Sequence, residues 1–246
     1  MLRGWVVLAM LLTQAVWARP PLSVCAEDQW PPFSFIQANR PAGASLDLVA
    51  AAFAAAGWQV QFESGSYTRC MQLVRDGHFD ALVDVAQNDE RKPQLLWPKQ
   101  ALLILELHLV SSQPRGNAPL GFEAMQHKRV GITLGYEYPN RMLSQPDIHL
   151  VESPSELGNF HHLARGDLDF MLLSRGTLAT LRDKLTKEER RHIYDWGQID
   201  ELPLYLAFSL HTAEGQQAAE AFDQGITTLR KSGRAQQVMD RWKAVP

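Results

Sequence analysis

The amino-acid sequence predicts an α/β protein built as two lobes that are joined by two crossing segments. Short β-rich runs alternate with longer helical runs, and this alternation occurs twice along the 246 residues. Two long apolar runs, Leu103–Ser111 and Leu202–Leu210, bracket the second occurrence. A chain that leaves one lobe, builds another and returns crosses between them twice. The pattern therefore predicts a cleft at the carboxyl ends of the strands that closes by a hinge.

Three strands and two helices are predicted in the first ninety residues. In the first helix the apolar residues Leu46, Val49 and Phe53 recur at helical spacing, and Gly57 is placed to end it. The predicted strands are Leu22–Ala26, Trp58–Phe62 and Phe79–Val85, and the predicted helices are Ser45–Ala56 and Thr68–Asp76. This β-α-β-α-β order predicts one α/β sheet with right-handed crossovers.

The second half repeats this order and is followed by a helical C-terminal segment. Ser155 precedes a helical pattern and is predicted to be its N-cap. The predicted strands are Arg129–Thr133, Ile148–Glu152 and Leu168–Leu173, and the predicted helices are Ser155–Ala164 and Ala213–Ala244, the latter with a break at Ser232–Gly233. We expect residues 22–108 and 206–246 to form the first lobe and 109–205 the second, with no single sheet running through both halves.

The first 18 residues have the pattern of a cleavable signal peptide. Arg3 supplies a positive start, Trp5–Leu12 an apolar segment, and Val16-Trp17-Ala18 the small residues that a signal peptidase reads. The apolar segment is shorter than the roughly 20 residues that a membrane-spanning helix needs. We expect cleavage after Ala18 and a soluble, exported mature protein.

Charge and motif content exclude several classes of function. The chain has 24 Lys and Arg against 27 Asp and Glu, a net charge of −3. These basic residues are scattered among carboxylates, whereas nucleic-acid binding needs them clustered, so no nucleic-acid partner is predicted. The sequence also contains no G-x-S-x-G, phosphate-loop or H-E-x-x-H motif. We expect a monomer without a cofactor and without catalytic activity.

The two cysteines, Cys25 and Cys70, are predicted to form a disulfide because an exported protein folds in an oxidising compartment. The alternative is a metal site. It has less support, since the chain has no C-x-x-C motif and His161 and His162 are adjacent instead of one helical turn apart. No metal is predicted.

Several short motifs along the chain resemble one family of binding proteins. They are Trp30-Pro31-Pro32-Phe33, Gly43–Leu48, Gly77-x-Phe79-Asp80-Ala81, Asn88–Arg91, Val130–Ile132, Gly166–Asp169 and Leu202–Ala207. Together they resemble the bacterial extracellular solute-binding proteins of family 3, the polar amino-acid type, over essentially all of the mature chain. The resemblance implies the two-lobe periplasmic-binding-protein (Venus flytrap) fold of type II, a periplasmic location and delivery of a ligand to an ABC permease.

The resemblance also implies a ligand with a carboxylate, held by Arg91. Family members that bind amino acids use an arginine at the matching position, whose planar fork suits a carboxylate. A surface ion pair of Arg91 with Asp89 or Glu90 is the alternative. The family's acidic residue for the ligand ammonium falls here on Ser174, or near Arg175. Asp84 is predicted either to replace that acid or to form an ion pair with Arg91 without touching ligand.

Five further positions complete the predicted site. Gln87 and Asn88 stand with Asp84 where the family places small hydroxyl residues. Trp30 and Phe33 match positions where family members stack the ligand side chain. Tyr136 lies in the loop of the second lobe that often supplies backbone N–H donors. Core packing is the alternative for each aromatic residue.

Two other functions share this fold. One is a periplasmic sensor that reports a ligand to a membrane signalling protein. The other is an enzyme resembling periplasmic cyclohexadienyl dehydratases, for which Glu137 is the candidate acid in the cleft. A solvated loop carboxylate is the alternative role for Glu137.

Overall fold

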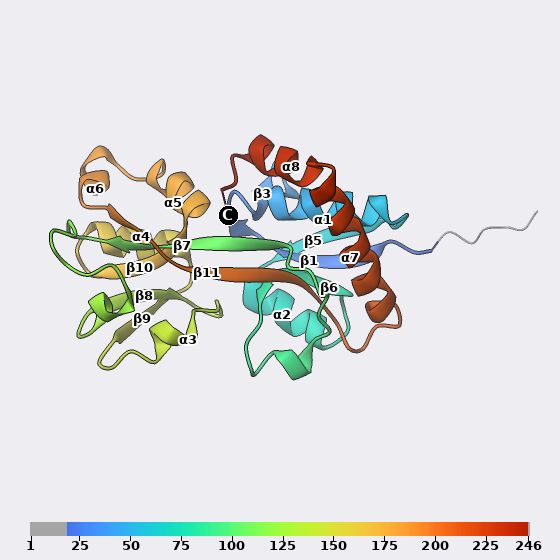
Figure 1. Ribbon diagram of the computed structural model, residues 1–246, viewed down its shortest axis with the longest axis horizontal. Helices are drawn as coiled ribbons and strands as arrows, with labels where there is room; N and C mark the ends of the chain where they lie inside the picture. The colour runs from blue at the N-terminus through green and yellow to red at the C-terminus, as the bar shows by residue number, and fades with distance from the viewer. Residues whose placement is uncertain (1–18, 246) are drawn as a thin grey trace, which may run out of the picture.

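The chain folds into two groups of helices and strands, which β7 (Leu103–Ser111) and β11 (Tyr194–Phe208) connect (Figure 1). This computed structural model describes residues 19–245. The predicted signal peptide falls on residues 1–18, which lie outside the described part of the chain. No helix within the described residues is long and apolar enough to cross a membrane.

The first group contains the predicted parallel strands, in the order β5-β1-β6. Helices α1, α7 and α8 cover one face of the sheet and α2 the other (Figure 1). Helix α1 packs closely on α7 at Gly225, where an added Cβ would lie 1.9 Å from the carbonyl oxygen of Ala52. The elements are β1 (Leu22–Glu27), β5 (Val60–Gly65), β6 (Ala81–Ala86), α1 (Ala44–Ala55), α2 (Tyr67–Arg75), α7 (Gly215–Lys231) and α8 (Arg234–Trp242).

A small antiparallel sheet that was not predicted follows β1. It consists of β2 (Gln29–Trp30), β3 (Ser34–Gln37) and β4 (Arg40–Ala42). The sheet leads the chain from β1 to α1 and holds Trp30 and Phe33, whose rings stack with centroids 4.5 Å apart. The short 3-10 helix η1 (Lys92–Gln94) lies between β6 and β7.

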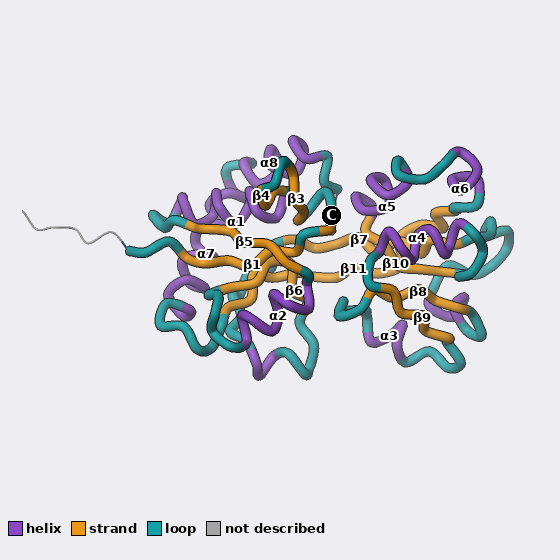
Figure 2. The backbone as a smooth tube through the Cα atoms, turned by 180° about the vertical axis from the view of Figure 1, so that it is seen from behind, coloured by secondary structure: helices purple, strands orange, loops and turns teal. Residues whose placement is uncertain are grey.

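The second group has a parallel arrangement of β10, β8 and β9, with helices around it (Figure 2). The N-cap prediction for α4 is confirmed, since Ser155 Oγ accepts a hydrogen bond of 3.1 Å from the backbone N–H of Gly158. The elements are η2 (Phe122–Met125), β8 (Arg129–Thr133), α3 (Asn140–Leu143), β9 (His149–Ser153), α4 (Glu156–Ala164), β10 (Phe170–Ser174), α5 (Arg175–Arg182) and α6 (Lys187–Arg191).

The expectation that no single sheet runs through both halves is wrong. All eight main strands form one hydrogen-bonded sheet, in the order β5-β1-β6-β11-β7-β10-β8-β9. The reason is the length of β7 and β11, which pair with each other along a two-stranded ribbon. Strand β6 pairs with the Leu204–Phe208 end of this ribbon, and β10 pairs with its Leu107–Ser111 end. The two groups are therefore attached to opposite ends of one ribbon.

Strand β11 begins at Tyr194, eight residues before the predicted start at Leu202. Its first part pairs with β7 alone, so its other edge is free of strands among the described residues. An edge strand keeps polar residues, and Tyr194–Glu201 does not show the apolar run on which the prediction relied.

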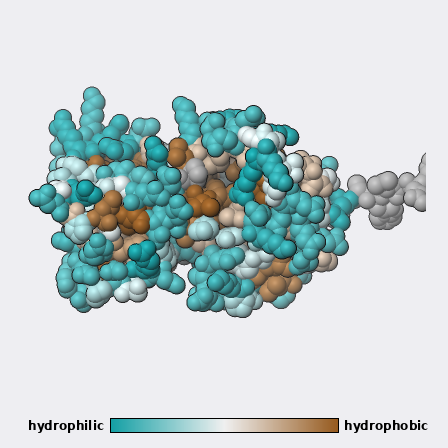
Figure 3. All heavy atoms as spheres, in the orientation of Figure 1, coloured by the Kyte–Doolittle hydropathy of each residue, from teal (hydrophilic) through white to brown (hydrophobic). Residues whose placement is uncertain are grey.

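The surface is mostly hydrophilic, and apolar residues show through near the middle of the molecule (Figure 3). The largest apolar cluster includes Phe53 and Phe222 between α1 and α7 and continues along β7 to Phe170. A separate cluster around Phe160 lies under α4 and α5. The predicted disulfide is confirmed: Cys25 of β1 and Cys70 of α2 are bonded, with Cα atoms 5.5 Å apart.

Candidate binding site

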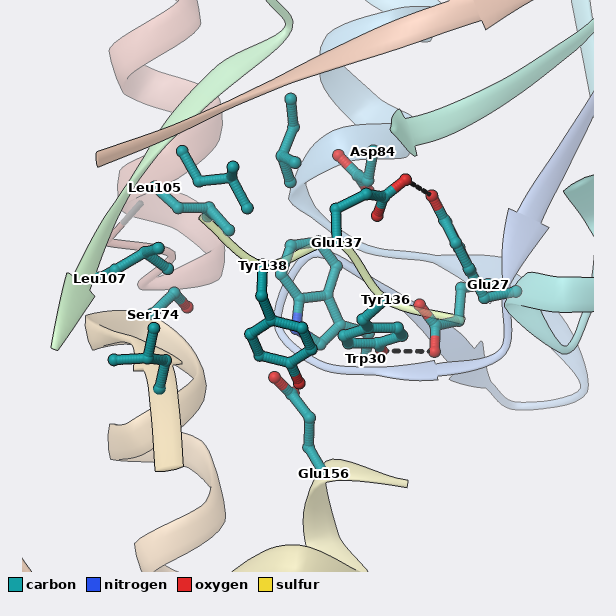
Figure 4. Close-up of a pocket in the computed structure, with 14 residues that line it drawn as sticks. Glu27, Trp30, Asp84, Leu105, Leu107, Tyr136, Glu137, Tyr138, Glu156 and Ser174 are labelled. Carbon is teal, nitrogen blue, oxygen red and sulfur yellow. Dashed lines mark hydrogen bonds between the residues drawn. The ribbon is translucent and has the colours of Figure 1, made fainter. Parts of the chain in front are cut away.

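A cavity of about 50 Å³ lies between the two groups of elements, with walls from both. Its volume is enough for roughly four water molecules, since a cavity needs about 10–15 Å³ to hold one. Figure 4 shows its side chains, which converge from β1, β6 and the β2 segment on one side and from the loop after β8, α4 and β10 on the other. The first group thus places strand ends at the cavity, as expected for an α/β ligand site.

Asp84 is the most buried charged residue of the cavity wall, with 7% of its surface exposed. Its φ of +62° turns the backbone of β6 sharply, a conformation that aspartate tolerates better than most residues. The hydroxyl of Ser45 donates a 2.8 Å hydrogen bond to Oδ1, whereas Oδ2 has no hydrogen-bond partner among the described residues. Burial raises the pKa of Asp84 to about 7, although the bond from Ser45 lowers it.

Glu27, the last residue of β1, supplies a second carboxyl group. The hydroxyl of Tyr136 donates a 2.6 Å hydrogen bond to Glu27 Oε1 and so joins the two groups of elements. Burial raises the pKa of Glu27 to about 8; the bond from Tyr136 opposes this, and the charges of Asp84 and Asp28 add to it. Both carboxyl groups therefore favour the protonated form until a cation approaches them.

Glu156, at the start of α4, brings a carboxyl group from the second group of elements. Burial raises its pKa well above the usual value, and the charge of Glu27 raises it further. Tyr138 lies beside it in Figure 4, and its hydroxyl accepts a 2.8 Å hydrogen bond from the backbone N–H of Thr133. Acidic groups from both sides of the cavity thus face a common space.

Leucines of the connecting ribbon form an apolar wall of the cavity. Leu105 and Leu107 come from β7, and Leu202 and Leu204 from β11, while Leu172 comes from β10. Among the described residues that line the cavity there is no lysine, arginine or histidine. The wall therefore offers carboxyl groups, aromatic rings and aliphatic groups, without a cation to receive an anionic ligand.

Arg91 lies at the rim, where it bridges the two groups. Its guanidinium forms an ion pair with Glu137 and donates hydrogen bonds of 3.1 Å to the Tyr67 hydroxyl and 2.9 Å to the Gly135 carbonyl. Tyr67 in turn donates a 2.7 Å hydrogen bond to Glu137. The side chains of Arg91 and Glu137 are only 12% and 8% exposed. This rim pair holds Glu137 and Gly135 against the end of the first sheet.

The structure brings four of the predicted site residues to the cavity wall: Trp30, Asp84, Tyr136 and Ser174. Ser174 also caps α5, since its Oγ accepts a 3.1 Å hydrogen bond from the backbone N–H of Thr177. Their contact with a ligand stays a prediction.

Phe33, Gln87, Asn88 and Arg91 do not line the cavity. Phe33 is fully buried beneath Trp30, and Asn88 Oδ1 accepts a 2.7 Å hydrogen bond from the backbone N–H of Arg91. Arg91 directs its fork to Glu137, not to the cavity, so neither predicted alternative, Asp89 or Glu90, is its partner. The alternative ion pair between Asp84 and Arg91 is not formed either.

Four residues of the cavity wall were not predicted: Glu27, Tyr67, Tyr138 and Glu156. The alternative role for Glu137 as a solvated carboxylate is wrong, because its side chain is buried against Arg91. Glu27 had a usable signal, since it directly follows a predicted strand and the carboxyl ends of strands carry the ligand site. Glu156 follows the predicted N-cap of a helix, where an acidic residue has a structural explanation of its own.

The described chain thus has two groups of α/β elements with a cavity between them. The model of the bacterial extracellular solute-binding proteins, family 3, matches residues 22–245, and this chain belongs to that family. No curated protein sequence matches the chain significantly.

Solved structures confirm the fold. The chain superposes with a TM-score of 0.73 on an ancestral arginine-binding protein bound to arginine, at 17% identity over 91% of this chain and 98% of that one. The arginine-, lysine-, histidine-binding protein ArtJ from Geobacillus stearothermophilus gives 0.74, at 12% identity over 91% and 95%. A histidine kinase sensor domain with similarity to periplasmic binding proteins gives 0.73, at 20% identity over 90% and 95%. The fold is thus that of the type II periplasmic binding proteins.

Proposed function

We propose that this chain is a periplasmic solute-binding protein that captures a small polar solute between two lobes and presents it to an ABC permease. The lobes are residues 22–108 with 206–246, and residues 109–205. The observation that carries the proposal is the cavity whose wall is divided between the two groups of elements. Two sets of contacts, Tyr136 with Glu27 and Arg91 with Glu137, close the groups around it.

Amino acids and related polar solutes are the first ligands to test, because the similar structures include proteins that bind arginine, lysine and histidine. A thermal-shift screen should cover amino acids, organic acids, amines, sugars and small peptides. A ligand at 100 times its Kd stabilises the folded state by roughly 2.7 kcal/mol, which such a screen detects. X-ray scattering with and without each hit then measures whether the two lobes close on the ligand.

A blocked cavity locates the binding event. Glu156→Arg places a long cationic side chain at the wall, where the introduced guanidinium can fill the cavity and pair with its carboxyl groups. We expect it to abolish the thermal shift of every hit. Glu152→Arg is the matched control, since Glu152 is exposed on β9 and the charge change is the same. A hit that stabilises both variants equally binds elsewhere and contradicts the proposal.

A sensor role is the second candidate, favoured by the similarity of the fold to a histidine kinase sensor domain. Pull-down of solubilised permease or kinase with ligand-loaded protein distinguishes the two roles. If neighbouring genes encode permease and ATPase subunits, they would favour transport. We propose no acid-catalyst role for Glu137, because Arg91 and Tyr67 already hold its carboxylate.

A further inference from the structure

We propose that the solute held in this cavity is a small organic cation whose charged groups are bound by Asp84 and Glu27 on one side and by Glu156 on the other, and that no cationic side chain of the described cavity wall anchors a carboxylate. This inference rests on the proposed function and names the substrate class of the same site. It departs from the expectation that Arg91 binds a ligand carboxylate, because the donors of Arg91 are directed to Glu137, Tyr67 and Gly135.

The free oxygen of Asp84 points to a missing donor. The residue is 93% buried, being 7% exposed, and it lines the cavity with Oδ2 unpartnered among residues 19–245. A buried acceptor without a donor is unfavourable, and a buried carboxylate without a cation is more so. An ammonium N–H in the cavity would supply both the donor and the charge.

The other charged groups around the cavity do not supply that charge. The titratable and charged groups that face it or adjoin it are Glu27 and Asp28 from the β1 end, Tyr67 from α2, Asp84 from β6, Arg91 at the rim, Tyr136, Glu137 and Tyr138 from the loop after β8, and Glu156 from α4. Arg91 is the one cation in this set of described residues, and its partner is Glu137. The remaining acidic groups have no cation of their own.

The shape of the site favours an organic cation over a metal ion. No three Asp, Glu, His or Cys side chains of the described chain converge closely enough to hold a metal. In Figure 4, Asp84 and Glu156 lie on opposite sides of the Trp30 and Tyr138 rings. Aromatic faces attract cations, and the leucines of β7 and β11 suit the methylene groups of an amine. The carboxyl groups therefore lie around a space whose other walls are aromatic and aliphatic, which suits an amine with an apolar chain.

Matched ligand pairs test the inference, because each pair differs only by a carboxylate. Isothermal titration calorimetry should compare agmatine with arginine and cadaverine with lysine. We expect each amine to bind with a Kd at least tenfold lower than that of its amino acid. Amino acids that bind more tightly than their amines, and lose this binding in Arg91→Ala, would overturn the inference and leave the solute-binding function intact.

Two further outcomes separate this inference from the proposed function. If sugars or organic acids bind in the cavity and none of these amines does, only the cation inference fails. If no solute of any class binds, both fail.

Asp84→Asn tests the residue on which the inference depends most. Asparagine has nearly the same shape and tolerates the positive φ, so the variant should fold. We expect at least a tenfold rise in the Kd for the amine, while the Tm of the empty protein does not fall. Asp89→Asn removes the same charge from an exposed side chain of the same lobe and should bind as the parent does. Equal affinity of Asp84→Asn and the parent would overturn the inference.

Proton release gives an independent readout. At pH 7 the raised pKa values leave Glu27 mostly and Asp84 partly protonated in the empty cavity, and an ammonium beside them favours ionisation, so amine binding should release protons. The binding enthalpy will then depend on the ionisation enthalpy of the buffer, and the Kd will fall as the pH rises from 6 to 8. If cadaverine binds with the same enthalpy in two buffers of different ionisation enthalpy, no protons are released, and the role of these carboxyl groups is contradicted.

Discussion

Buried carboxyl groups have a cationic partner at the rim of the cavity and none in the described cavity wall. At the rim, Glu137 receives the guanidinium of Arg91 and the hydroxyl of Tyr67, so its charge is neutralised within the protein. In the cavity, the hydroxyl of Tyr136, the residue directly before Glu137, donates a hydrogen bond to Glu27, and Asp84 receives only the hydroxyl of Ser45. No described cation lines the cavity.

This difference separates a carboxyl group that has a cation within the protein from carboxyl groups that have none among the described residues. A carboxylate whose cation is supplied by the protein stabilises one arrangement of the two lobes. A carboxylate without such a partner is costly in the empty protein and gains most when a cation enters. The arginine that resembles a ligand anchor in sequence pairs with Glu137 of the other group of elements.

The disulfide lies near both the cavity and the rim. Its removal should have the largest effect on the free energy of unfolding. Cys25 lies two residues before Glu27 of the cavity, and Cys70 three residues after Tyr67 of the rim. The double variant Cys25→Ala/Cys70→Ala should lower the free energy of unfolding by about 4 kcal/mol, the loop-closure value for a sequence separation of 45 residues. Urea denaturation measures this, and the reduced parent protein should behave alike. Unchanged stability after full reduction would contradict the expectation.

Breaking the rim pair should have the next largest effect. Arg91→Met leaves Glu137 buried without a cation, which should cost the closed arrangement about 3 kcal/mol. X-ray scattering should then show a larger radius of gyration, since the lobes separate and expose the carboxylate to water. The matched double variant Arg91→Met/Glu137→Met removes both charges and should regain most of the compactness. A single variant as compact as the parent would show that the pair does not hold the lobes together.

Removing the unpaired carboxyl group should have a smaller effect of opposite sign. The pKa of Asp84 is raised from 3.8 to about 7, so its contribution to stability is full below pH 3.8 and is lost as the pH rises through 7. In the empty protein the shift alone corresponds to about 4 kcal/mol at pH 8, of which burial of the asparagine amide takes back about 2 kcal/mol. Asp84→Asn should therefore be more stable than the parent at pH 8 by about 2 kcal/mol, and closer to it at pH 5. Urea denaturation at both pH values provides the measurement. A variant that is less stable than the parent at pH 8 would contradict the burial of a costly carboxyl group.

Much of the fold could be predicted because its buried strands and helices have simple apolar patterns. The predicted boundaries of Leu103–Ser111 and Arg129–Thr133 agree with β7 and β8. The elements that were missed depend on tertiary context. Strands β2 to β4 are two to four residues long and have no repeating pattern, and the first part of β11 is a polar edge strand.

The site was harder to predict because the sequence does not show the partners of a charge. The resemblance to the family placed Asp84 and Trp30 at the site, and both lie at the cavity wall. The pairing of Arg91 with Glu137 could not be predicted, since 46 residues separate them and only the contact between lobes brings them together. The match of Arg91 to a ligand-binding arginine therefore predicted that it lies near the cavity, but not that it pairs with Glu137.

The continuous ribbon also sets the order in which this chain can fold as it emerges with its N-terminus first. Strand β6 needs the last residues of β11 as its neighbour, and α1 packs against α7, so the first sheet waits for the C-terminal quarter of the chain. The strands β8, β9 and β10 have their partners β7 and one another well before that point. The middle of the chain can thus fold first, while the N-terminal strands remain incomplete until the final helices emerge.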